Sequence, residues 1–127
     1  MSTPVTVIYH AACPDGFGAA FAAWKYFGPA ARFCPMHHGE AWEALGLDGQ
    51  ITYILDFSFP REALEAMALV ARSVTQIDHH ASARAPWAAL LTNVDGHERF
   101  NHTDLPLAVL FDLDKSGARL AWEHFFP

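Results

Sequence analysis

The fold is decided by residues 5–27, which read VTVIYHAACPDGFGAAFAAWKYF. The first six residues are β-branched, apolar or aromatic up to His10, which predicts a buried strand over residues 5–10. The segment 13–16, CPDG, has the composition of a turn. Apolar side chains then recur at helical spacing until Gly28 and Pro29 end the pattern; they are Phe17, Ala20, Phe21, Trp24 and Phe27. We therefore expect a strand, a turn and a helix that buries this aromatic stripe.

The alternation of strand and helix continues along the chain. Short apolar runs predict strands over residues 31–36, 51–55, 73–77 and 107–113. A helix is expected after Ser58 and Pro60, and another from Ser116 through Phe126, whereas residues 86–107 are ambiguous. Strands that alternate with helices imply βαβ crossovers, and nearly uniformly apolar strands imply helices on both faces. We predict an α/β fold of Rossmann-like type, with a mostly parallel sheet, in a single domain over residues 1–127.

Composition limits the classes of function. The chain has 127 residues, of which 52% are hydrophobic and 17% charged, as in a globular domain. Eight Lys and Arg against fourteen Asp and Glu give a net charge of -6, which argues against binding to long duplex DNA. The apolar runs are shorter than the ~18–20 residues of a membrane helix, and residues 1–4 show no secretion signal. Two cysteines are too few for a disulfide scaffold. We expect a cytoplasmic protein without a membrane partner.

Acids and histidines stand at the ends of three predicted strands. His10 ends the first strand and Asp15 follows in the turn. Asp56 follows the strand 51–55, and the strand 73–77 leads into residues 78–80, which are Asp-His-His. Ligands bind outside the carboxyl ends of open parallel sheets. We therefore expect these side chains to meet at one edge of the sheet.

This set of residues suits a metal ion. Carboxylates packed together repel one another and are stabilised by a cation. Imidazole and carboxylate ligands without a thiolate favour Mn²⁺, with Fe²⁺, Co²⁺ or Mg²⁺ as alternatives. Cys13 lies within the same segment, where it could reach a soft metal or serve as a small packing residue.

The same segments carry a resemblance to a known family. HAACPDG at 10–16, Leu55-Asp56, and Asp78-His79-His80 resemble, in this order, the first three motifs of the DHH phosphoesterase family. That family includes manganese-dependent pyrophosphatases, single-strand exonucleases, oligoribonucleases and cyclic-dinucleotide phosphodiesterases. The resemblance covers the chain from Val5 onward. It implies a parallel-sheet domain with a two-metal site.

The resemblance also implies a role for each residue. His10 and Asp15 would bind the first metal, Asp56 would bridge the two metals, and His79 would bind the second. The remaining two residues would act beside the metals, with Asp78 orienting a ligand and His80 facing the substrate phosphate.

Two features depart from the family pattern. Phe17 occupies the position of a second acid in the first motif, and a fourth-motif carboxylate would lie beyond Pro127. Both acids belong to the second metal site. We therefore expect a complete first site, a second site reduced to Asp56 and His79, and a chain without the C-terminal substrate domain of the family.

Two functions follow as hypotheses. The first is a metal-dependent phosphoesterase acting on a small nucleotide or a short oligonucleotide. The alternative is a non-catalytic truncated relative that binds one metal or a nucleotide. If no further domain covers them, Phe125 and Phe126 would form an exposed patch suited to a homo-oligomer.

Overall fold

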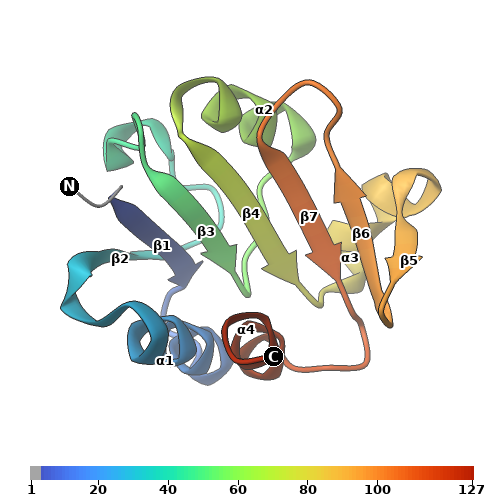
Figure 1. Cartoon of the computed structure of the whole chain (residues 1–127), viewed down its shortest axis with the longest axis horizontal. Helices are drawn as coiled ribbons and strands as arrows, with labels where there is room; N and C mark the ends of the chain where they lie inside the picture. Colours follow the sequence, from blue (N-terminus) through green and yellow to red (C-terminus); the bar gives the residue numbers. More distant parts are fainter. Residues whose placement is uncertain (1–3) are drawn as a thin grey trace.

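The computed structural model describes residues 4–127, which form one seven-stranded sheet with helices on both faces (Figure 1). The strand order is β2-β1-β3-β4-β7-β6-β5. The first five strands in this order are parallel, and β6 and β5 are antiparallel to their neighbours. The predicted α/β fold with a mostly parallel sheet is confirmed.

The elements follow the sequence pattern closely. The strands are β1 Val5–His10, β2 Ala31–Met36, β3 Ile51–Leu55, β4 Ser73–Asp78, β5 Thr92–Val94, β6 His97–Asn101 and β7 Leu107–Phe111. The α-helices are α1 Pro14–Phe27, α2 Arg61–Val70, α3 Ala81–Arg84 and α4 Gly117–Phe125. Short 3₁₀ turns cover Gly28–Ala30, Glu43–Leu45 and Ala85–Leu90. The ambiguous segment thus holds the β5–β6 hairpin and the turns before it.

The core consists of two layers, one on each face of the sheet. Val7 and Leu55 point to the face that α1 and α4 cover, whereas Ile8 and Ile54 point to the face that α2 covers. This alternation follows from the period of two along a strand. Both faces are therefore apolar, as expected for a parallel sheet between helices.

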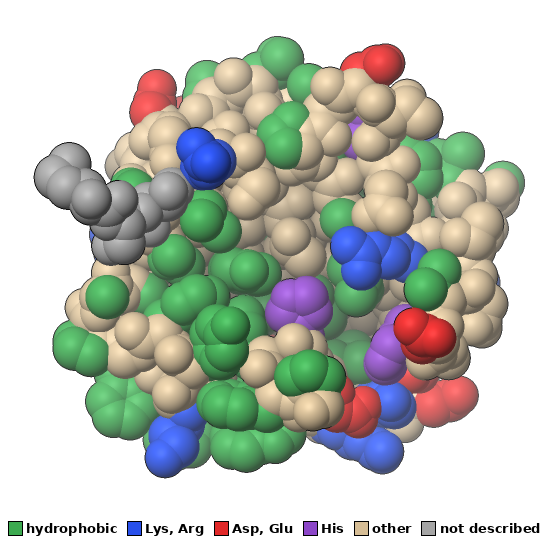
Figure 2. Space-filling view, viewed as in Figure 1, with side chains coloured by type: hydrophobic (Ala, Val, Ile, Leu, Met, Phe, Trp, Pro, Cys, Tyr) green, Lys and Arg blue, Asp and Glu red, His purple; other side chains and the backbone are tan. Residues whose placement is uncertain are grey.

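The buried aromatic stripe predicted for α1 is wrong. Phe17, Phe21 and Trp24 are exposed by 68%, 48% and 47%, and the buried face of α1 consists of alanines and glycine. Small residues face inward because α1 also packs tightly on α4: a Cβ atom at Gly18 would lie 2.8 Å from the Cβ of Ala118. Figure 2 shows hydrophobic side chains gathered on the surface at the lower left of the view, where Figure 1 places α1.

Two predictions concern the ends of the chain, and the structure tests the one at the C-terminal end. The absence of a secretion signal concerned the first residues and lies largely outside the described range. The expected exposed patch of Phe125 and Phe126 is wrong for Phe125, which is 6% exposed because it packs against Phe27 and Tyr53, whereas Phe126 is 38% exposed. Across residues 4–127, the helices are too short or too polar to cross a membrane.

Candidate metal centre

The sheet topology has a switch point beside β1. The chain passes from β1 to β2 on one side and returns to β3 on the other, so the strand order reverses between β1 and β3. Ligands in open α/β sheets bind at such a point, outside the carboxyl ends of the strands. His10 is the last residue of β1, and Asp56 follows the last residue of β3. Both side chains therefore lie at the switch point.

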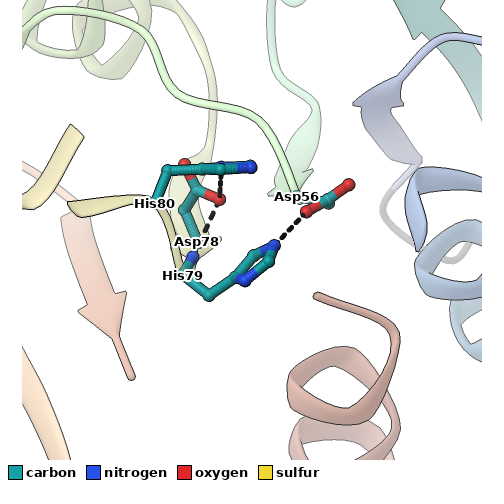
Figure 3. Close-up of side chains that lie close together, drawn as sticks. All are labelled: Asp56, Asp78, His79 and His80. Atoms are coloured by element: carbon teal, nitrogen blue, oxygen red, sulfur yellow. Dashed lines mark hydrogen bonds and ion pairs between the residues drawn. The ribbon is translucent and has the colours of Figure 1, made fainter. Parts of the chain in front are cut away.

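Asp56 is at the centre of the cluster. Its side chain is 1% exposed, and its backbone has a φ of 54°, an uncommon conformation for a residue other than glycine. One carboxylate oxygen, Oδ1, lies 2.8 Å from Nε2 of His79 (Figure 3). The other, Oδ2, lies 3.8 Å from Nδ1 of His10 and 3.7 Å from Sγ of Cys13. Burial raises the pKa of Asp56, and the negative charge of Asp15 raises it further, while His79 opposes the shift.

Asp15 connects this cluster to α4. Its carboxylate accepts hydrogen bonds from the backbone N–H groups of Gly117 and Ala118, each at 2.8 Å, and lies 3.1 Å from Nε2 of His79. Burial acts to raise the pKa of Asp15, but these two N–H groups and His79 hold it below its ordinary value. Glycine is needed at 117 because a Cβ atom there would lie 2.5 Å from Oδ1 of Asp56. The positive end of the α4 dipole thus faces two carboxylates.

Asp78 holds the two histidines that follow it. Oδ1 accepts a hydrogen bond from the backbone N–H of His79 at 2.8 Å and lies 2.7 Å from Nδ1 of His80 (Figure 3). Oδ2 accepts a hydrogen bond from the hydroxyl of Ser58 at 2.6 Å. The carboxyl group of Asp78 is fully buried, so these contacts satisfy both oxygens and fix the direction of His80.

A cavity of about 510 Å³ lies beside His80, on the face of the sheet that carries α2. Its lining includes the polar residues His38, Arg61 and Ser82 and the aromatic residue Trp87. The His80 side chain is 43% exposed. Its second ring nitrogen, Nε2, is therefore free to contact a molecule in this cavity.

The structure brings together all four residues predicted as metal ligands. His79 lies at Oδ1 of Asp56 and His10 at Oδ2, while Asp15 lies beside Nε2 of His79. Two sets of side chains have donor atoms within 4.8 Å of one another, namely Asp56 with Asp78, His79 and His80, and Asp56 with His10 and Cys13. By resemblance His10 would share its ion with Asp15, whereas the contacts place Asp15 next to His79.

Three residues outside the predicted site set also contribute to the site. The helix expected after Ser58 and Pro60 begins at Arg61 without a side-chain cap, and the Ser58 hydroxyl donates a hydrogen bond to Asp78. His38 stacks on Phe57, with ring centroids 4.7 Å apart, and thereby reaches the cavity. The backbone of Gly117 holds Asp15. Gly117 follows Ser116, whose hydroxyl caps α4 by accepting a hydrogen bond from the N–H of Arg119. This position is the one sequence feature that indicates free backbone N–H groups at the start of the helix.

Comparison with known proteins identifies a viral relative. An uncharacterized protein of Acanthamoeba polyphaga mimivirus is 26% identical over 135 aligned positions, which cover 95% of this chain and 29% of the viral protein. The chain thus spans less than a third of that relative's length. No family model matches the chain, and no solved structure matches it.

Proposed function

We propose that the protein is a divalent-metal-dependent phosphoesterase acting on a small nucleotide or a short oligonucleotide. The observation that carries the proposal is the contact between His10 and Asp56. Nδ1 of His10 is buried and has no hydrogen-bond partner among residues 4–127. It faces Oδ2 of Asp56 at 3.8 Å, which is longer than a hydrogen bond. Buried polar atoms are normally paired, so this pair of donor atoms fits a shared cation.

The charge of the site supports the same proposal. Asp15, Asp56 and Asp78 meet at one sheet edge, and the pKa of Asp56 is raised by burial and by Asp15. Among the described residues, histidines, backbone N–H groups and the Cys13 thiol face the carboxylates of Asp15 and Asp56, and no Lys or Arg pairs with them. A divalent cation would remove the remaining repulsion. Carboxylate and imidazole donors suit Mn²⁺, the ion that the resemblance to DHH phosphoesterases implies.

The residues around the cavity suit a phosphate ester. In its doubly protonated form, His80 would donate Nδ1–H to Asp78 and Nε2–H to a phosphoryl oxygen. Arg61, which also pairs with Glu65 at 3.4 Å, lines the cavity with its guanidinium 5.6 Å from the centroid of the Trp87 ring, so a positive charge and an aromatic group lie together there. The chemistry that a bound divalent ion supplies is polarisation of a phosphoryl oxygen and activation of water near neutral pH.

The experiment is a hydrolysis assay on metal-free protein reloaded with Mn²⁺. A fluorescent dinucleotide is the substrate, and Asp56→Asn and His80→Ala are the test variants. Both should lose activity by orders of magnitude, because one removes ligand charge and the other the phosphate contact. Asp48→Asn is the matched control, since Asp48 is an exposed acid before β3, at the other end of the strand. Loss in the control equal to that in Asp56→Asn would contradict the assignment.

A second candidate function is a non-catalytic domain that binds one metal ion. Two observations favour it. Phe17, which stands where DHH phosphoesterases have a second acid in the first motif, is exposed on α1. Both oxygens of Asp15 already accept hydrogen bonds from α4. This candidate predicts metal binding by the wild-type protein without hydrolysis of the dinucleotide. For either function we propose a cytoplasmic location, which two free cysteines support.

A further inference from the structure

Cys13 lies at the side of Asp56 that faces His10. Its Sγ is 3.7 Å from Oδ2 of Asp56, and Nδ1 of His10 is 3.8 Å from the same oxygen. The donor atoms of the three residues all lie within 4.8 Å of one another. They come from the end of β1, the residue before α1 and the residue after β3. Three segments of the chain thus bring a thiol, an imidazole and a carboxylate to one point.

The thiol of Cys13 is directed at Asp56 rather than at the first turn of α1. Cys13 is the N-cap residue of α1, but its side chain makes no capping hydrogen bond. It is half-buried and directed at the carboxylate of a nearly fully buried aspartate. His10 beside it has a buried ring nitrogen without a hydrogen-bond partner within residues 4–127. The thiol donates a hydrogen bond to Oδ2 of Asp56, and the His10 nitrogen faces the same oxygen at 3.8 Å without forming one.

We propose that Cys13, His10 and Asp56 form a Zn²⁺ site with three protein ligands. Ligands at about 2.0–2.3 Å from one tetrahedral zinc ion lie about 3.4–3.6 Å from each other. The separations of 3.7 and 3.8 Å need only a small contraction to reach this range. Three protein ligands leave a fourth position open, as in catalytic zinc sites. This inference rests on the metal centre of the proposed function and adds a ligand to it.

The Cys13 thiolate would make the site of Cys13, His10 and Asp56 bind Zn²⁺ more tightly than Mn²⁺. Thiolate donors select zinc over hard cations such as Mn²⁺ and Mg²⁺, because their sulfur is soft. Asp15 and His79, on the other side, offer only oxygen and nitrogen. Binding of Zn²⁺ through the thiolate would release the thiol proton of Cys13 to solvent.

The test uses Co²⁺ as a spectroscopic substitute for Zn²⁺ in the full chain. A cobalt–thiolate bond gives a near-ultraviolet charge-transfer band that oxygen and nitrogen ligands do not give. Cys13→Ser should remove the band and keep the fold, since serine is a favoured N-cap residue. Cys34→Ser is the matched control, because Cys34 lies within β2 and packs against the core. Wild type and Cys34→Ser should both show the band.

Calorimetric titration measures the same site without spectroscopy. Cys13→Ser should lower Zn²⁺ affinity by more than about 100-fold, because loss of a direct ligand exceeds the 10–100-fold cost of losing an outer partner. Its Mn²⁺ affinity should stay within a few-fold of wild type. Binding of Co²⁺ without the band, or equal Zn²⁺ affinity in Cys13→Ser, would overturn the role of Cys13 but leave the metal centre standing. Failure of wild type to bind Co²⁺, Zn²⁺ and Mn²⁺ would overturn both.

Discussion

At the scale of single residues, the direction of His80 depends on a serine hydroxyl. Ser58 donates to Oδ2 of Asp78 at 2.6 Å, and Oδ1 of the same carboxyl group holds His80. Ser58→Ala would leave one buried oxygen without a partner. The free energy of unfolding, measured by urea denaturation, should fall by about 1–3 kcal/mol.

The neighbouring serine provides the control for this prediction. Ser82 is exposed and lines the same cavity, so Ser82→Ala should change the free energy of unfolding by less than about 0.5 kcal/mol. Equal stability of Ser58→Ala and wild type would contradict the role given to the hydroxyl.

The residues that the sequence located are those attached directly to strand ends. His10, Asp56 and Asp78 end or follow a strand, so the topology alone determines where they lie. The contacts of Ser58 and Cys13 were not predictable in the same way. They depend on how a loop turns after β3 and on the side-chain rotamer before α1, and neither follows from hydrophobic periodicity.

At the scale of elements, the turn of the β5–β6 hairpin has a distinctive sequence. Asp95 and Gly96 have φ values of 52° and 85°, and they join β5 to the antiparallel strand β6. An Asp-Gly pair with two positive φ angles is typical of a type I′ hairpin turn. In α1, by contrast, periodicity indicated the helix but not its buried face, because packing against α4 selects for small residues rather than for hydrophobicity.

The last turn of α4 gives a pH-dependent prediction. Burial lowers the pKa of His124 below its ordinary value of 6.5, and the positive charges of Arg99 and His97 lower it further. These effects outweigh the helix dipole, which favours a protonated histidine at this end. Below pH 6.5 the unfolded chain therefore binds a proton that the native state resists. The free energy of unfolding should fall as the pH drops from 6.5 toward the lowered pKa.

Replacement of the imidazole isolates this contribution. His124→Gln cannot titrate, so its free energy of unfolding, measured by urea denaturation from neutral to mildly acidic pH, should fall less steeply than that of wild type. His37→Gln, in the exposed loop after β2, should behave as wild type. Parallel pH curves for wild type and His124→Gln would show that His124 is not the group responsible.

At the scale of the whole molecule, the candidate site joins segments that are distant in sequence. β1, β3 and β4 end at it, α1 begins at it, and the N-terminus of α4 binds Asp15 over a separation of more than 100 residues. The unfolded chain cannot present these groups together. An ion that binds there should therefore stabilise the entire fold rather than one loop.

Thermal unfolding tests this expectation. An ion at 100 times its dissociation constant should add about 2.7 kcal/mol to the free energy of unfolding. The Tm of wild type should therefore be higher with Mn²⁺ or Zn²⁺ than with a chelator. Asp56→Asn should lose this shift and could exceed wild type in chelator, because the variant removes a carboxylate whose pKa is raised by burial and by the charge of Asp15. Asp48→Asn should keep the shift. If the ion leaves the Tm of wild type unchanged, no metal site joins these strand ends.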